Sequence, residues 1–159
     1  MPPLAAGEEA ECDTNFVSNA SLKGQPEKID ATHAVLTVTD VKVTLQLAIH
    51  IWVPQGATQH VIDHEQGHRQ ISEHYYQTAG QVAEQVSAPY LGKQVSVTGA
   101  DLNSELNQLL QQMGAEITAE YNKKLNPNLA QNRYDDITDH ARNEISASAA
   151  VAQVLADAQ

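Results

Sequence analysis

The sequence is short of cysteine, of basic residues and of long apolar stretches, and each shortage excludes a class of protein. A single cysteine, Cys12, cannot form an internal disulfide and cannot supply the thiolates of a zinc finger. Only 9 Lys and Arg stand against 20 Asp and Glu, for a formal charge of -11, and such an acidic surface repels nucleic acid and anionic lipid. Any metal site in this chain must therefore use imidazole and carboxylate ligands.

The apolar residues occur in short runs. The longest, residues 47–53, is interrupted by His50 and is far too short to cross a bilayer, so we expect no membrane insertion. The first 20 residues contain acidic but no basic residues, which is the opposite of a signal peptide. With 159 residues, 42% of them hydrophobic, the chain can build one compact domain with a real core. We expect a flexible tail over residues 1–13 and a single domain over 14–159.

The spacing of the apolar residues predicts an α+β fold, in which strands come first and helices follow. β-branched residues alternate along the chain in the strand segments, and the period then changes from two to that of a helix. The expected elements are antiparallel strands over 31–53 with a turn near Asp40, a long helix over 58–87, a short strand over 93–99, a helix capped by Asp101 and a further helix from about Thr138.

One part of the long helix carries a motif with chemistry, the run His64-Glu65-Gln66-Gly67-His68. His64 and His68 are one turn apart on the same face, so both imidazoles can reach one zinc ion at roughly 2.0–2.1 Å. Glu65 is rotated by about 100° from His64 and lies near the metal without being forced to bind it. That position suits a base that takes a proton from the water that zinc activates. Two histidines beside a glutamate on an apolar face are also costly to bury unless something binds them.

A catalytic zinc needs a third protein ligand, and several residues are candidates. His60 is two turns before the second histidine of the motif, about 12 Å along the helix axis, too far for one ion to take all three. His74 has the spacing of the metzincin pattern, but Ile71 stands where that pattern needs the glycine of a turn. The last predicted helix is the better source, because His140 and Glu144 are four residues apart and can both face inward.

Two motifs together resemble a known family. The pairing of His64-Glu65-Gln66-Gly67-His68 with Tyr134-Asp135-Asp136-Ile137-Thr138-Asp139-His140 is similar to the predicted secreted bacterial zinc-dependent proteases, domain of unknown function 922. The resemblance spans most of the chain, and Ala141 stands where that family usually has Gly. It implies a zincin-like fold, His140 as the third zinc ligand and Glu65 as the general base or acid. It also implies an exported location, periplasmic or secreted.

Two further residues of the second motif are candidates on their chemistry. Tyr134 can hydrogen-bond the oxyanion of a tetrahedral intermediate, or it can be an aromatic packed in a loop. Asp135 can orient a ligand histidine through its second ring nitrogen, or it can cap a turn. The candidate site therefore comprises a catalytic pair, three zinc ligands and four residues around them: Glu65 and Tyr134; His64, His68 and His140; and Asp135, Glu144, His74 and His60.

We therefore expect a zinc metalloendopeptidase that acts on a peptide or protein substrate and binds no nucleic acid; the sequence specifies no oligomeric state. The edge of the N-terminal sheet can hold the substrate as an added strand. The alternative is a non-catalytic zinc-binding or interaction protein that keeps the site, although metal binding alone has no use for Glu65. A di-iron carboxylate protein is disfavoured, because it needs a second Glu-x-x-His that this chain lacks.

Overall fold

The structure is a computed structural model that describes residues 10–157. Its contacts divide the chain into two compact units, and each is described by itself. The first unit comprises residues 1–16, 47–78 and 126–159, and the second comprises 17–46 and 79–125. Residues 1–9 of the predicted tail lie outside the described residues, and the first strand begins at Glu11. The single domain predicted over 14–159 stays a prediction.

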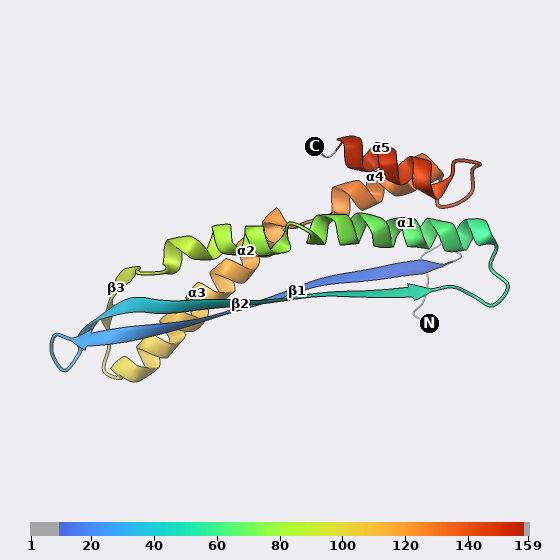
Figure 1. Ribbon diagram of the computed structural model, residues 1–159. Coiled ribbons are helices and arrows are strands. Elements are labelled where there is room, and N and C mark those ends of the chain that lie inside the picture. The colour runs from blue at the N-terminus through green and yellow to red at the C-terminus, as the bar shows by residue number, and fades with distance from the viewer. Residues whose placement is uncertain (1–9, 158–159) are drawn as a thin grey trace. The chain divides into compact units, whose positions relative to one another are not determined.

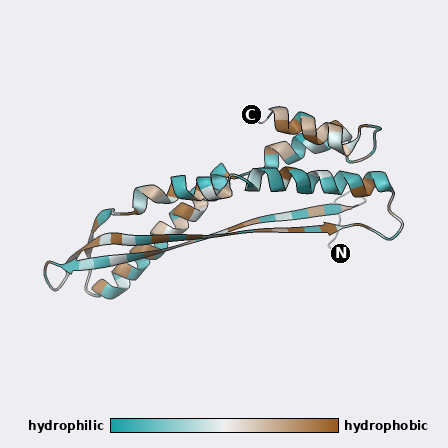
Figure 2. Cartoon of the chain, in the orientation of Figure 1, coloured by the Kyte–Doolittle hydropathy of each residue, from teal (hydrophilic) through white to brown (hydrophobic). Residues whose placement is uncertain are grey.

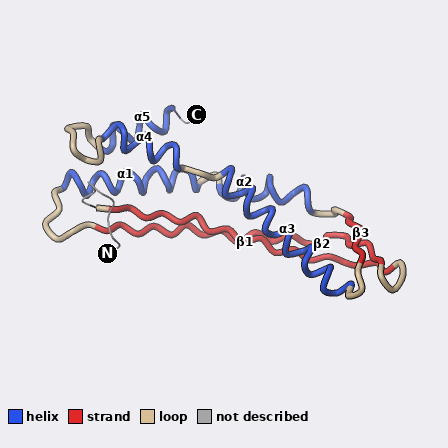
Figure 3. The backbone as a smooth tube through the Cα atoms, turned by 180° about the vertical axis from the view of Figure 1, so that it is seen from behind, coloured by secondary structure: helices blue, strands red, loops and turns tan. Residues whose placement is uncertain are grey.

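The sheet has three antiparallel strands in the order β1-β2-β3 (Figure 1). β1 (Glu11–Lys28) and β2 (His33–Trp52) are consecutive, and Figure 3 shows them running side by side. β3 (Gln94–Thr98) pairs with the start of β2, in a register that joins His33 to Thr98. Residues 17–46 of β1, β2 and their connection belong to the second unit, and the two ends belong to the first.

The turn that we predicted near Asp40 is wrong, because β2 continues through this residue. Up to Val38 the most buried residues of β2 have even numbers, and from Val41 they have odd numbers. The side chains that face inward therefore shift by one position within a continuous strand. The reversal lies instead at residues 29–32, where Asp30 accepts a hydrogen bond from the Thr32 amide at 2.8 Å. β1 itself was not predicted, because many of its inward residues are small or polar and give no apolar alternation.

The second unit packs a helix against β3 and the start of β2. It contains α2 (Ala79–Ser87), a 3-10 turn (Ala88–Tyr90), β3 and α3 (Leu102–Lys124). The predicted cap of α3 is confirmed, since the Asp101 carboxylate accepts a hydrogen bond from the Ser104 amide at 3.2 Å. The core of this unit joins strand and helix residues: Ala34, Leu36, Val97, Leu102 and Leu106.

The first unit contains α1 (Gln59–Tyr76), α4 (Asn128–Thr138) and α5 (Ala147–Asp157). The single helix predicted over 58–87 is wrong, because α1 ends at Tyr76 and α2 starts at Ala79. The helix expected from Thr138 is also wrong, because α4 ends there and α5 begins nine residues later. The core of the unit consists of Ile71, Ala130, Tyr134, Ala150, Val151 and Val154.

The predicted α+β class is confirmed, with an antiparallel sheet followed by helices. Figure 2 shows that α5 is largely apolar, whereas much of α1 is hydrophilic. The helix with the histidine motif therefore enters the core of its unit with polar side chains among its buried residues. Within residues 10–157, the helices are too short or too polar to cross a bilayer.

Candidate metal centre

α1 presents the two motif histidines on the face that is buried in the first unit. The helix starts at Thr58, whose side chain accepts a hydrogen bond from the Val61 amide, as is usual for a threonine cap. His64 is 6% exposed and Ile71, about two turns further on, is fully buried in the core. The apolar face on which we predicted the two motif histidines is thus confirmed as the inward face of α1, where polar side chains lie beside apolar ones.

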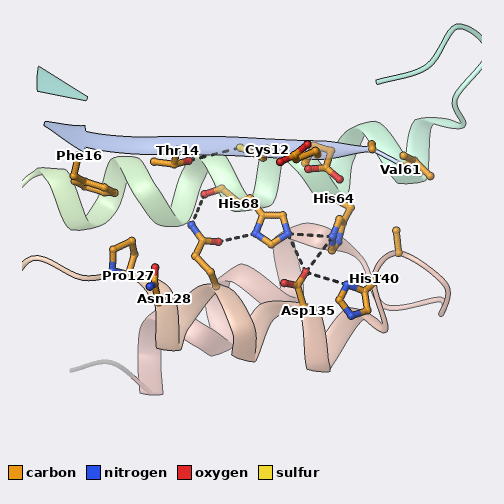
Figure 4. Close-up of a pocket in the computed structure, with 15 residues that line it drawn as sticks. Cys12, Thr14, Phe16, Val61, His64, His68, Pro127, Asn128, Asp135 and His140 are labelled. Atoms are coloured by element: carbon orange, nitrogen blue, oxygen red, sulfur yellow. Dashed lines mark hydrogen bonds and ion pairs between the residues drawn. The ribbon is translucent and has the colours of Figure 1, made fainter. Parts of the chain in front are cut away.

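Three ligand atoms converge between α1 and α4 (Figure 4). Nε2 of His64 lies 3.2 Å from Nε2 of His68. Oδ1 of Asp135 lies 2.9 Å from Nε2 of His68 and 3.4 Å from Nε2 of His64. Two ligands of a tetrahedral zinc ion, each at about 2.0–2.1 Å from it, are roughly 3.3 Å apart. The spacing and the chemistry of these three donors therefore fit a divalent cation of the zinc type.

Gln131, on α4, fixes which nitrogen of His68 faces the cluster. Its Oε1 accepts a hydrogen bond from Nδ1 of His68 at 2.6 Å, and its Nε2 donates to the His68 carbonyl at 3.0 Å and to Ser72 Oγ at 2.8 Å. With the proton on Nδ1, the lone pair of Nε2 points at Asp135 and is available to a metal. Gln131 was not among the predicted site residues, although its position four residues before Asp135 puts it on the same face of α4.

Tyr134 forms the back of the cluster. Its ring stacks on His64 with centroids 4.9 Å apart and meets the edge of His68 at 4.8 Å, while its hydroxyl donates to the His64 carbonyl at 3.1 Å. A Cβ at position 67 would collide with this hydroxyl, which explains why the motif carries Gly67. The hydroxyl proton is thus used inside the protein, and the oxyanion role of Tyr134 stays a prediction.

The charges of the cluster are coupled. Burial alone would lower the pKa of His68, but the hydrogen bond and charge of Asp135 and the hydrogen bond of Gln131 outweigh it and raise the pKa above its usual value. Burial alone would raise the pKa of Asp135, but its hydrogen bonds to His64 and His68 lower it well below the usual range. Protonated His68 therefore pairs with Asp135 through the same two atoms, Nε2 and Oδ1, that would bind a metal ion.

His140 lies next to this cluster but outside its compact core. Its Nδ1 is 3.7 Å from Oδ1 of Asp135, and its side chain is 43% exposed. α4 ends in three residues with positive φ, 48° for Asp139, 51° for His140 and 63° for Ala141. Each costs about 1–2 kcal/mol for an L-residue, and the last falls where the resembling family has Gly. Asp135 occupies the third place in the observed donor set, and the ligand role of His140 stays a prediction.

The cluster lies in a cavity of about 340 Å³. The first residues of β1 form one wall, α4 and the turn after it form the other, and α1 supplies His64, Glu65 and His68 (Figure 4). Glu65 is 5% exposed and lines this space, and its role as a base stays a prediction. Comparisons with protein-family models, curated proteins and solved structures found no significant match. The function is therefore inferred from this geometry and from the two motifs.

The remaining candidates lie outside the donor set. His60 lines a second, smaller hollow beside His64, and its Nε2 is buried without a hydrogen-bond partner among residues 10–157. His74 is near the end of α1, which continues to Tyr76, and its ring meets the neighbouring Tyr75 at 6.3 Å. Glu144 is exposed in the turn before α5.

Proposed function

We propose that this protein is a zinc metallopeptidase, in which His64, His68 and Asp135 hold the metal and Glu65 is the general base. The observation that carries the proposal is the convergence of two imidazoles and one carboxylate within 2.9–3.4 Å, beside a buried glutamate in an open cavity. A non-catalytic metal site needs the three ligands but has no need of Glu65.

Different residues of the chain have different roles in the proposed peptide hydrolysis. When bound, zinc supplies Lewis-acid chemistry, which polarises a carbonyl group and makes water more acidic. Glu65 accepts the proton of the attacking water and returns it to the leaving amine. Gln131 and Tyr134 hold the two imidazoles in place, so that the donor atoms need little reorganisation.

The position of β1 indicates how a peptide enters the site. β1 is an edge strand of the sheet, and its first residues line the cavity. An extended peptide can add to this edge by main-chain hydrogen bonds, which brings a peptide bond past the cluster. The zincin-like fold and the exported location belong to the same proposal, because the resemblance in the two motifs implies both.

The test compares peptide cleavage by the native protein, Glu65→Gln and Glu73→Gln, each loaded with zinc. Glu73 lies on the same helix but is exposed and paired with Arg69, so its substitution is a matched control. We expect Glu65→Gln to keep the metal and to lose cleavage by about 10³-fold or more, and Glu73→Gln to behave as native. Equal cleavage by all three proteins would contradict the role of Glu65, and cleavage no faster than in a protein-free blank would leave the non-catalytic alternative.

A further inference from the structure

One carboxylate in the cavity has no part in the proposed reaction. Glu65 and Asp135 have roles as base and ligand, but Glu11, the first residue of β1, lines the same space without one. The nine Lys and Arg of the chain are all absent from the residues that line this cavity. The space is therefore acidic even after a divalent cation has balanced the other two carboxylates.

Glu11 also has an unsatisfied atom. Its Oε2 is buried and has no hydrogen-bond partner within residues 10–157. A buried carboxylate oxygen that lacks a hydrogen-bond partner is costly, so a group that donates a hydrogen bond to this carboxylate is favoured. The adjacent Ala10 is 5% exposed, so the backbone that carries Glu11 is itself packed.

The neighbours of Glu11 that line the cavity include no Lys or Arg. Burial raises the pKa of the Cys12 thiol to about 11, with Glu65 adding to the effect, so this side chain is neutral near pH 7. The opposite wall carries neutral amides, Asn128 and Gln131, and the side chain of the latter is already engaged with His68. A cationic group of a substrate is the partner that this wall lacks.

We infer that Glu11 selects substrates with a positive charge close to the cleaved bond, either a Lys or Arg side chain or a free amino terminus. The inference rests on the proposed function and names its substrate class. The cavity, at about 340 Å³, has room for a long basic side chain. A charge-assisted hydrogen bond from the substrate to the Glu11 carboxylate would offset the cost of burying it. The acidic chain, with its formal charge of -11, attracts cationic peptides to the same place.

The experiment uses the full zinc-loaded chain and one peptide series, with Arg, Gln or Glu at each position around the cleaved bond and with free or acetylated amino termini. Glu11→Gln is compared with Asp13→Asn, because Asp13 lies on the same strand, is exposed and does not line the cavity. We expect Glu11→Gln to lower kcat/KM for the preferred cationic peptide by about tenfold or more, mainly through KM. The Gln peptides and the Asp13→Asn variant should stay within about twofold of native.

Acetylation distinguishes the two sources of charge: a preference that it abolishes comes from the amino terminus, and one that survives comes from the side chain. In Glu11→Lys, the Glu peptide should have a higher kcat/KM than the Arg peptide, which reverses the order in the native protein. An unchanged preference in Glu11→Gln, with zinc content and circular dichroism as in the native protein, would overturn the inference while leaving the peptidase intact.

A binding measurement separates this inference from the proposed function. Fluorescence anisotropy reports the affinity of the same peptides for zinc-loaded Glu65→Gln with and without Glu11→Gln. If the native protein cleaves nothing but binds Arg peptides about tenfold more weakly without Glu11, the enzymatic proposal fails and the charge selection stands. If the affinity depends neither on the charge of the peptide nor on Glu11, the charge selection fails.

Discussion

The two compact units of this protein bury different chemistry. The buried polar or charged residues among 10–157 are His64, Glu65, Ser72 and Thr138, and all belong to the first unit. The second unit buries an apolar set built around Leu36, Val97 and Leu102. The non-glycine residues with positive φ also lie in the first unit, at 139–141, within the described part of the chain. Costly polar burial and backbone strain therefore coincide with the candidate metal centre, as expected where function opposes stability.

The polar groups of the first unit are not scattered but connected. Ser72 donates to Thr14 at 3.1 Å and accepts from Gln131, which in turn holds His68. This chain of hydrogen bonds joins β1, α1 and α4 around His68, one of the three candidate ligands. The second unit, by comparison, relies on the ordinary packing of apolar side chains. The following predictions test whether the two units differ in function as they differ in chemistry.

The largest effect is expected from removing a metal ligand. Asp135→Ala and His68→Ala should weaken zinc binding by about 10³-fold or more, because each removes one of three converging donors. His74→Ala should bind zinc like the native protein, and His140→Ala should lose less than Asp135→Ala. Competition with a chelator measures the affinities. Loss of zinc in His140→Ala together with retention in Asp135→Ala would show that His140, and not Asp135, is the third ligand.

A smaller loss is expected from Gln131, which touches the ligand and not the metal. Gln131→Met removes the acceptor for Nδ1 of His68 and should weaken zinc binding by about 10–100-fold. Gln131→Glu keeps an oxygen acceptor for Nδ1 of His68 and should bind zinc at least as tightly as the native protein. The exposed neighbour provides the control, Asn132→Met. Equal affinities for all three variants would mean that Gln131 only packs against α1.

The pH dependence of stability should also differ between metal-free and zinc-loaded protein. His68 has a raised pKa when folded, so without metal it stabilises the fold below its unfolded pKa of about 6.5, and this stabilisation is lost as the pH rises through the folded value. Asp135 has a lowered pKa and stabilises the fold above about pH 4. Zinc needs neutral imidazole, so its own stabilising effect should instead grow with pH. Urea denaturation at pH 5.5 and 8, with and without zinc, measures both slopes; parallel slopes would contradict the pairing of His68 with Asp135.

The smallest effect compares one glycine in each unit. Gly67→Ala drives a methyl group into the Tyr134 hydroxyl and should lower the free energy of unfolding by about 1–3 kcal/mol. At Gly80, in α2 of the second unit, a Cβ meets nothing within 4 Å, so Gly80→Ala should be neutral or stabilising by up to about 1 kcal/mol. Thermal unfolding checks both, and similar changes in the two variants would remove the argument that Tyr134 requires Gly67.

Local patterns in the sequence predicted the features that depend on short-range chemistry. The inward stripe through His64 and Ile71 followed from the helical period, and the Asp101 cap followed from the residue types at a helix start. β1 escaped prediction because its inward residues are mostly small or polar. The break between α1 and α2 was also missed, because the apolar stripe continues across it while the backbone does not.

By itself the sequence determined the donor chemistry: one Cys and the His64-Glu65-Gln66-Gly67-His68 run leave imidazole and carboxylate as the only ligands for a metal. Only the tertiary structure decided which carboxylate joins them. Helical spacing relates residues within one helix, but the distance from α1 to α4 depends on how the two pack around Tyr134 and Ile71. The left-handed turn at 139–141 then leaves His140 at the rim and Asp135 at the centre, because α4 ends where a helix had been expected to begin.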